Sequence, residues 1–265
     1  MSPTLAARHI PADALTLSLA ILATLVLGTV VALLLKAMVA KGRPHGVIDN
    51  ILVRVKAWWI ISLLLGLAWL AGEAGVYALF AMAILLASRE FMTAGGDYRT
   101  EPSRRLAGAS LCMAGVAFAP MLLTVDLPGH SGRGGFLLMF LLLVSQLGDV
   151  FQYIWGKLAG RHALAPRISP SKTVEGLLGG IFSASILGAA LAWATPFSPW
   201  QAAGLALLIS LLGVAGGLLL SAEKRRRGIK DWGSLVAGHG GVLDRLDSVY
   251  LSAPGFYLAV KLGWG

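Results

Sequence analysis

The densest group of chemically useful side chains lies in residues 221–248, which read SAEKRRRGIKDWGSLVAGHGGVLDRLDS. This segment holds six cations, a histidine flanked by glycines, and the pair Asp244 and Asp247. Basic side chains and free backbone N–H groups at glycines bind phosphate oxygens. Two carboxylates three residues apart lie on one face of a helix, where they can share a divalent cation. The segment therefore predicts metal-dependent chemistry on a polyphosphate.

A second polar group interrupts the apolar stretch 136–156. Its members recur at spacings of three, four and seven, which place them on one face of a helix: Gln146, Asp149, Gln152, Tyr153 and Gly156. A carboxylate within a membrane span is costly unless it is partnered or hydrated. Asp149 therefore indicates an aqueous site near the end of this stretch. A hydrogen-bonded seam between helices is the alternative.

The next segment, GRHALAPRISPSKTVEGLLGG at 160–180, predicts the start of a sixth helix. Ser169 and Pro170 are suited to the N-cap and the first helical position. Lys172 and Thr173 would then lie in the first turn, where an anion is favoured. Lys172 is interpreted as a phosphate contact, with an interfacial lysine as the alternative. A face of small residues every four positions predicts close packing against another helix: Gly176, Gly180, Ala184 and Gly188.

The elements that must position these groups are predicted to be membrane helices. Hydrophobic residues make up 57% of the 265 residues and charged residues only 13%, against about 25% charged in soluble domains. Most of the apolar stretches reach the ~20 residues that a helix needs to cross a bilayer: 14–40, 56–71, 74–92, 105–125, 136–156, 172–194, 200–220 and 246–264. The predicted fold class is an all-α, polytopic integral membrane protein with about eight transmembrane helices. Residues 1–135 would hold the first four spans, and residues 136–265 a catalytic region of spans five to eight with a cytoplasmic signature loop at 221–245.

The distribution of cations predicts the orientation. Most Lys and Arg residues lie in four alternate loops, at 41–56, 89–105, 157–172 and 221–245, whereas the other side carries only Arg8, Arg133 and Lys261. Cytoplasmic loops are enriched in such residues, which explains the net charge of +9 better than nucleic-acid binding does. We expect both termini outside, an uncleaved first anchor, and a cytoplasmic active site in a bacterial inner membrane. Glu90, beside Arg89 at the end of one stretch, is interpreted as an interfacial charge.

These motifs resemble those of the phosphatidate cytidylyltransferase (CDP-diacylglycerol synthase) family. The family pattern S-x-x-K-R, K-D, G-H-G-G and D-R-x-D is matched by Ser221, Lys224, Arg225, Lys230, Asp231, Gly238, His239, Gly240, Gly241, Asp244, Arg245 and Asp247. An upstream pattern is matched by Asp149, Tyr153, Gly156 and the run from Ile168 through Gly176. The resemblance covers about residues 145–250. Three positions depart from it: Gly217, where many bacterial members have Asp; Ala237, where Pro is usual; and Gln152, where Ala is usual.

The resemblance implies transfer of cytidylyl from CTP to phosphatidate or a related lipid phosphate, with Mg²⁺ as the cofactor and membrane lipids as partners. A homodimer is left open. Asp244 and Asp247 would be metal ligands, joined by Asp149, and Lys172 and His239 would act beside them. The implied substrate-binding residues are Ser221, Lys224, Arg225, Lys230, Arg245, Tyr153, Gly240 and Gly241. Arg226 and Arg227 are interpreted as topology or surface charges.

Three other interpretations of the function remain open at this point. A CTP-dependent lipid kinase of the polyprenol type would use a similar metal site but attack the γ-phosphorus with a lipid hydroxyl; a divergent cytidylyltransferase would use another lipid acceptor. A transporter would also explain the spans and Asp149. It should show internal repeats and broken helices at mid-membrane, and the two halves of this sequence show no such repeat.

Overall fold

The computed structural model describes residues 12–39, 41, 43–95, 102–127, 130–234 and 240–264. These residues are mostly helical and include one two-stranded hairpin, so the predicted all-α class is confirmed. The chain divides into two compact units, Met1–Leu63 and Leu64–Gly265.

The first unit contains α1 (Ala12–Met38) and the start of α2 (Gly46–Leu70). Two side-chain contacts join these helices. Lys36 forms an ion pair with Asp49 in the first turn of α2, and Trp59 Nε1 donates to Thr29 Oγ1 over 3.0 Å. The two helices therefore form a hairpin of their own.

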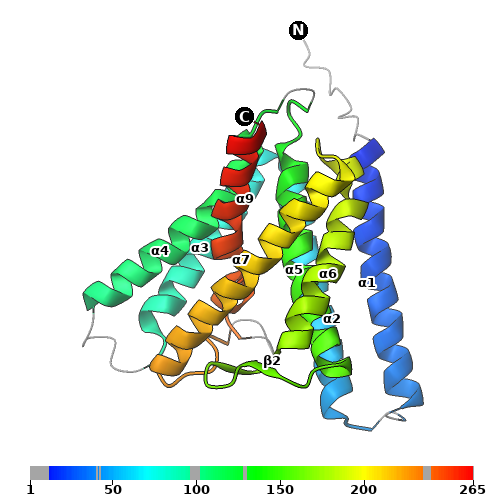
Figure 1. Cartoon of the computed structure of the whole chain (residues 1–265), viewed down its shortest axis with the longest axis vertical. Coiled ribbons are helices and arrows are strands. Elements are labelled where there is room, and N and C mark those ends of the chain that lie inside the picture. The colour runs from blue at the N-terminus through cyan, green and yellow to red at the C-terminus, as the bar shows by residue number, and fades with distance from the viewer. Residues whose placement is uncertain are drawn as a thin grey trace. The chain divides into compact units, whose positions relative to one another are not determined.

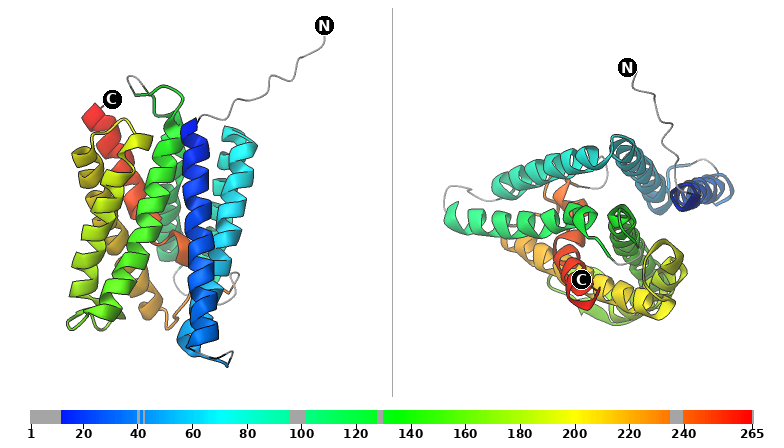
Figure 2. Two further views of the ribbon diagram at one scale, coloured as in Figure 1. Left: turned by 90° about the vertical axis from the view of Figure 1, so that its right-hand side faces the viewer. Right: turned by 90° about the horizontal axis from the view of Figure 1, so that it is seen from above.

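The second unit contains the remaining elements, shown in Figure 1. They are α3 (Glu73–Thr93), α4 (Pro102–Met121), η1 (Leu122–Thr124), α5 (Gly134–Leu158), β1 (Ala163–Ala165), β2 (Ser169–Thr173), α6 (Val174–Ala190), η2 (Ala192–Ala194), α7 (Pro199–Arg226), α8 (Leu243–Leu246) and α9 (Val249–Trp264). The β1–β2 hairpin and the C-terminal end of α7 lie at the same end of this unit (Figures 1 and 2). The polar segments after α5 and after α7 are therefore brought to one end.

Six described helical segments are long and apolar enough to cross a membrane: Ser18–Met38, Ile51–Leu70, Glu73–Thr93, Pro102–Thr124, Gly134–Leu158 and Pro199–Arg226. The predicted count of about eight spans is not confirmed. The two remaining predicted spans correspond to α6 and α9, which have 17 and 16 residues. At ~1.5 Å per residue, helices of this length fall short of ~30 Å of hydrocarbon.

The predicted start of the sixth helix is wrong by four residues. Ser169 and Pro170 belong to β2, which pairs with β1 in antiparallel register, and the N-cap of α6 is Thr173, whose Oγ1 accepts from Gly176 N over 3.0 Å. The residue before a proline favours extended backbone, so Ser169 starts a strand more readily than a helix. Lys172 consequently lies in the strand before α6 and not in the first turn of a helix.

The predicted packing face of α6 is confirmed. Gly176, Gly180, Ala184 and Gly188 are all buried. A Cβ at Gly180 would lie 2.9 Å from Gln152 Cα of α5, and a Cβ at Gly188 would lie 2.7 Å from Ala202 O of α7. Because these positions lack bulk, α6 packs closely against both neighbours and holds the hairpin at its N-terminus beside α5 and α7.

The ends of α7 are defined by local chemistry. Ser198 Oγ accepts from Gln201 N, and Gln201 Oε1 accepts from Ser198 N over 2.9 Å, which is a reciprocal capping box. At the other end, the chain turns after Arg227 into Gly228, which has a φ of 69°. The helix therefore delivers Lys224, Arg225 and Arg226, all in its last turn, to the polar end of the unit.

Candidate functional site

The site is built around Asp149 on α5 and the turn between α8 and α9. Ser145 Oγ donates to Ser248 Oγ over 3.0 Å, and the Ser248 hydroxyl bonds the Asp149 carboxylate. One turn away on the same helix face, Gln146 Nε2 donates to Arg245 O over 3.3 Å. These polar contacts hold the turn against α5, so part of the predicted polar face of α5 does line the candidate site.

Asp247 lies in this turn and faces Asp149. The two half-buried carboxylates repel each other, and both interact with the charges of Lys172 and Arg245. Burial, followed by the negative charge of Asp149, raises the pKa of Asp247 to about 6. A divalent cation relieves repulsion of this kind, and carboxylate oxygens are the ligands that Mg²⁺ takes. The carboxylate pair Asp149 and Asp247 therefore fits a metal site.

Helix α7 approaches the pair at two glycines. A Cβ at Gly217 would lie 3.1 Å from Lys172 Nζ and 3.8 Å from Asp247 Oδ2. A Cβ at Gly216 would lie 2.7 Å from Asp247 O. Gly217, one of the departures from the family pattern, is therefore next to the lysine ammonium and the carboxylate.

Asp244 is used differently from Asp247. It is buried, and its Oδ1 accepts from Lys224 Nζ over 2.7 Å. Its Oδ2 accepts from the backbone N–H groups of Trp232 and Gly241, each over 2.8 Å. Across the described ranges, no three His, Cys, Asp or Glu side chains are grouped so that they could hold a metal ion, so the predicted convergence of Asp244 with Asp149 and Asp247 is not seen there. Asp244 instead bonds both sides of the loop between α7 and α8.

The backbone of this loop requires glycine at position 240. Gly240 has a φ of 80°, and a Cβ there would lie 2.5 Å from Asp244 Oδ2. A side chain at this position would be strained and would displace the Asp244 carboxylate. The glycines that the sequence assigned to phosphate binding thus have a demonstrable role in loop geometry.

The other predicted site residues are distributed as follows. Arg225, at the end of α7, donates from Nε to Ile168 O over 3.2 Å and from Nη1 to Ile229 O over 2.9 Å, so it ties the β1–β2 turn to the loop. Lys230 is exposed and Ser221 is half-buried. Tyr153 is 43% exposed and lies under Lys157 Nζ. His239, Gly238 and Ala237 lie outside the described residues.

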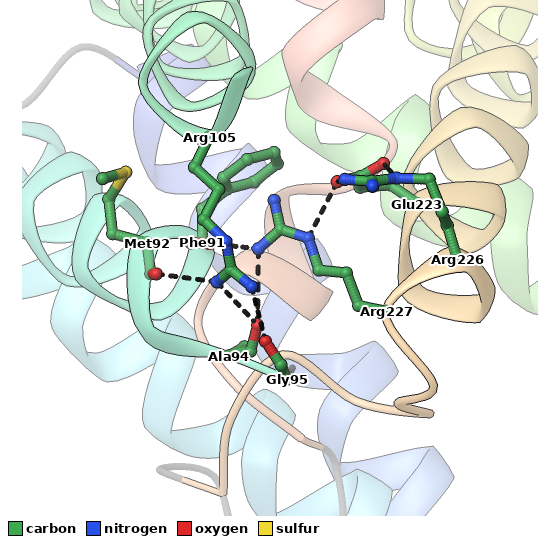
Figure 3. A network of polar contacts seen from close by, with 8 residues as sticks. All are labelled: Phe91, Met92, Ala94, Gly95, Arg105, Glu223, Arg226 and Arg227. Carbon is green, nitrogen blue, oxygen red and sulfur yellow. Dashed lines mark hydrogen bonds and ion pairs between the residues drawn. The ribbon is translucent and has the colours of Figure 1, made fainter. Parts of the chain in front are cut away.

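Two residues have roles that the sequence did not predict, and the first is Arg227. Its side chain is 2% exposed, so its interpretation as a surface or topology charge is wrong. Arg227 Nε donates to Glu223 Oε1 over 2.8 Å, Nη1 donates to Phe91 O, and the guanidinium lies 4.3 Å from the Phe91 ring centroid. Figure 3 shows this network, which also includes Arg105 of α4.

The second is Glu90, which is not merely an interfacial charge. Its Oε1 accepts from Val242 N over 2.9 Å, and its Oε2 accepts from Leu243 N over 2.8 Å. The only signal in the sequence was an acidic residue at the end of an apolar stretch. Its partners are more than 150 positions away, so no local pattern could have identified them.

The charges of this arrangement would suit phosphates beside a metal ion. The carboxylate pair offers oxygen ligands, Lys172 and Arg245 lie next to it, and Arg225 and Lys230 add cations at the same end of α7 and in the loop that follows. Fold and candidate site together define a helical membrane protein with a charged site in which α5, the β1–β2 hairpin, α7 and the α8–α9 turn meet.

Comparison with known proteins identifies the family. The model of the Cytidylyltransferase family matches residues 10–262, and the chain therefore belongs to this family. The chain is 41% identical over 149 residues to the uncharacterized protein YnbB of Escherichia coli (strain K12), covering 55% of this chain and 48% of that one. It is 36% identical over 148 residues to a phosphatidate cytidylyltransferase of Staphylococcus aureus (strain COL), covering 55% and 56%. The chain spans about half the length of these curated relatives.

Proposed function

We propose that this protein transfers the cytidylyl group of CTP to phosphatidate, giving CDP-diacylglycerol and pyrophosphate. The observation that carries the proposal is the pairing of Asp149 with Asp247 beside Lys172, whose ammonium and the Asp247 carboxylate both lie next to Gly217, in a chain of the Cytidylyltransferase family. The phosphatidate cytidylyltransferases among its relatives support this choice of acceptor.

In this reaction an oxygen of the lipid phosphate attacks the α-phosphorus of CTP. The bond from that phosphorus to the bridging oxygen breaks, and pyrophosphate leaves with the bonding electrons. The lipid phosphate is already a competent nucleophile, so the protein mainly has to align it and neutralise charge.

The described residues divide this work among them. Asp149 and Asp247 would hold Mg²⁺, which when bound neutralises charge on phosphate oxygens and on the leaving group. Lys172 and Arg245 lie beside the pair and would hold phosphate groups there. Arg225 and Lys230, at the exposed end of the site, are proposed to bind the outer phosphates. Asp244 and Lys224 are proposed to fix the loop between α7 and α8, which their contacts support.

The setting is also part of the proposal. The six apolar helices support a membrane protein, and the cations of the alternate loops support a cytoplasmic site in a bacterial inner membrane. Phosphatidate would then reach the site from the bilayer and CTP from the cytoplasm.

The experiment that tests this proposal follows the label in CTP. Purified full-length protein in detergent receives Mg²⁺, CTP labelled at either the α- or the γ-phosphorus, and phosphatidate or diacylglycerol as the acceptor. We expect the α-label to enter lipid only with phosphatidate, and the γ-label to appear in pyrophosphate. Entry of the γ-label into lipid would establish a lipid kinase instead, and no label in either lipid would reject cytidylyl transfer to phosphatidate.

A further inference from the structure

Glu90 of α3 connects the N-terminal half of the chain to the loop of the candidate site through both of its carboxylate oxygens. Both carboxylate oxygens accept consecutive backbone N–H groups, from Val242 over 2.9 Å and from Leu243 over 2.8 Å. Hydrogen bonds to a carboxylate are about twice as strong as neutral ones. These two bonds fix the backbone immediately before Asp244.

The loop also packs around this carboxylate on both sides. A Cβ at Gly233 would lie 2.6 Å from Glu90 Oε1, and a Cβ at Gly241 would lie 2.3 Å from Glu90 Oε2. No other residue type fits at these positions without movement of the loop or of Glu90. The absence of side chains at Gly233 and Gly241 thus allows the loop to approach the carboxylate closely.

The end of α3 that carries Glu90 is itself held in place. Arg105 of α4 donates to Met92 O over 2.9 Å and to Gly95 O over 2.6 Å, and Arg227, the C-cap residue of α7, donates to Phe91 O. Figure 3 shows both guanidinium groups converging on the carbonyl oxygens at this helix end. Glu90 therefore stands on a backbone that two buried cations fix.

From Glu90 the contacts run directly into the candidate site. Gly241 N, next to the bonded amides, donates to Asp244 Oδ2, and Asp244 Oδ1 binds Lys224. Asp247 follows three residues later and interacts with Lys224 as well as with Asp149. A shift of residues 241–243 would thus move the turn that carries one member of the carboxylate pair.

We propose that Glu90 is a positioning residue for the candidate site: it holds residues 241–243 so that Asp247 stays opposite Asp149, and it does not itself contact substrate. The expected effect of Glu90 on turnover rests on the proposed function, whereas its role in holding residues 241–243 does not. In this proposal, α3 and α4 have a structural role, because they hold the loop that follows α7 in place.

The test combines amide hydrogen exchange with kinetics on full-length protein in detergent. Glu90→Gln keeps the size of the side chain but replaces one acceptor oxygen with an amino group that cannot accept. We expect exchange in peptides that contain Val242 and Leu243 to accelerate about ten- to a hundredfold, with α6 peptides unchanged. Pyrophosphate release should lose at least about tenfold in kcat, and the half-saturating Mg²⁺ concentration should rise. Glu73→Gln, at the exposed first residue of α3, is the matched control. It should change neither the exchange rates nor the kinetic constants.

A second variant probes the same contact from the loop. Gly241→Ala introduces a Cβ against Glu90 Oε2 and has no positive φ to strain. Both variants break the same contact between Glu90 and the loop. The fold loss of kcat in Glu90→Gln/Gly241→Ala should therefore be much smaller than the product of the fold losses in the two single variants. Fully multiplicative losses, or unchanged exchange at Val242 and Leu243 in Glu90→Gln, would overturn the proposal.

The two claims can fail separately. Faster exchange with wild-type kcat and Mg²⁺ dependence would reject the positioning role and leave Glu90 as a structural residue. If the wild-type protein releases no pyrophosphate with any lipid phosphate, the proposed function fails. The exchange data, and the stability of the double variant compared with that of the two single variants, then decide whether Glu90 holds the loop.

Discussion

Lys224 and Asp244 form a buried ion pair whose disruption has a predictable cost. Lys224 is 8% exposed, Asp244 is 9% exposed, and Nζ lies 2.7 Å from Oδ1. Removing one member of such a pair leaves an uncompensated buried charge and costs about 3–5 kcal/mol. Because Asp244 keeps two backbone N–H donors, we expect Lys224→Met to lose about 3 kcal/mol, the lower end of that range. In a chain of this size this corresponds to a fall in Tm of roughly 6–12 °C.

The assay is thermal unfolding of purified protein in one detergent. Arg225→Met is the matched control, since Arg225 is exposed and its described hydrogen bonds go to the backbone oxygens of Ile168 and Ile229, and we expect it to lose less than about 1 kcal/mol. Lys224→Met/Asp244→Asn should recover part of the loss, because it removes the stranded charge. A Tm of Lys224→Met equal to that of wild type, or a double variant less stable than the single one, would refute this reasoning.

Two further predictions concern Gly217 of α7 and Arg227, which follows the last residue of this helix. Gly217→Ala places a Cβ 3.1 Å from Lys172 Nζ, so we expect kcat/KM for CTP to fall about three- to tenfold. The control is Gly204→Ala, where a Cβ meets nothing within 4 Å, and its kcat/KM should equal that of wild type. Equal kcat/KM values for the two variants would contradict the placement of Lys172. In the same thermal assay, Arg227→Met should lose about 3 kcal/mol of stability, because the Arg227 side chain is only 2% exposed. Arg226→Met should lose less than about 1 kcal/mol, because the Arg226 side chain is 35% exposed. Comparable Tm values for these two variants would show that the buried contacts of Arg227 contribute little.

The sequence predicted those parts of the structure that depend on local spacing. The four-residue recurrence from Gly176 to Gly188 is a property of a single helix, and it correctly predicted the packing face of α6. The polar spacing on α5 likewise placed Asp149 at the candidate site, since Gln146 contacts α8 and Asp149 contacts the turn that follows it. Tyr153, on the same predicted face, is exposed.

Contacts between distant segments could not be predicted in this way. Lys172 lies in a strand because Thr173 pairs with Ala163, and a helix-capping pattern carries no information on that pairing. Arg227 is buried by Phe91, which is 136 positions away, so its place in a run of cations gave the wrong environment. The same holds for Glu90, whose bonds to Val242 and Leu243 exist only once α3 and α8 are packed together.

The central claim is that Asp149 and Asp247 support cytidylyl transfer to phosphatidate. The most direct measurement is transfer of the α-label of CTP to phosphatidate by wild type, Asp149→Asn and Asp247→Asn, at equal amounts of protein with equal Tm and with Mg²⁺ at saturation. Loss of a metal-ligand charge worth several kcal/mol predicts that each variant transfers at most about a thousandth of the wild-type label. Label transfer by Asp247→Asn within about tenfold of wild type would contradict the account.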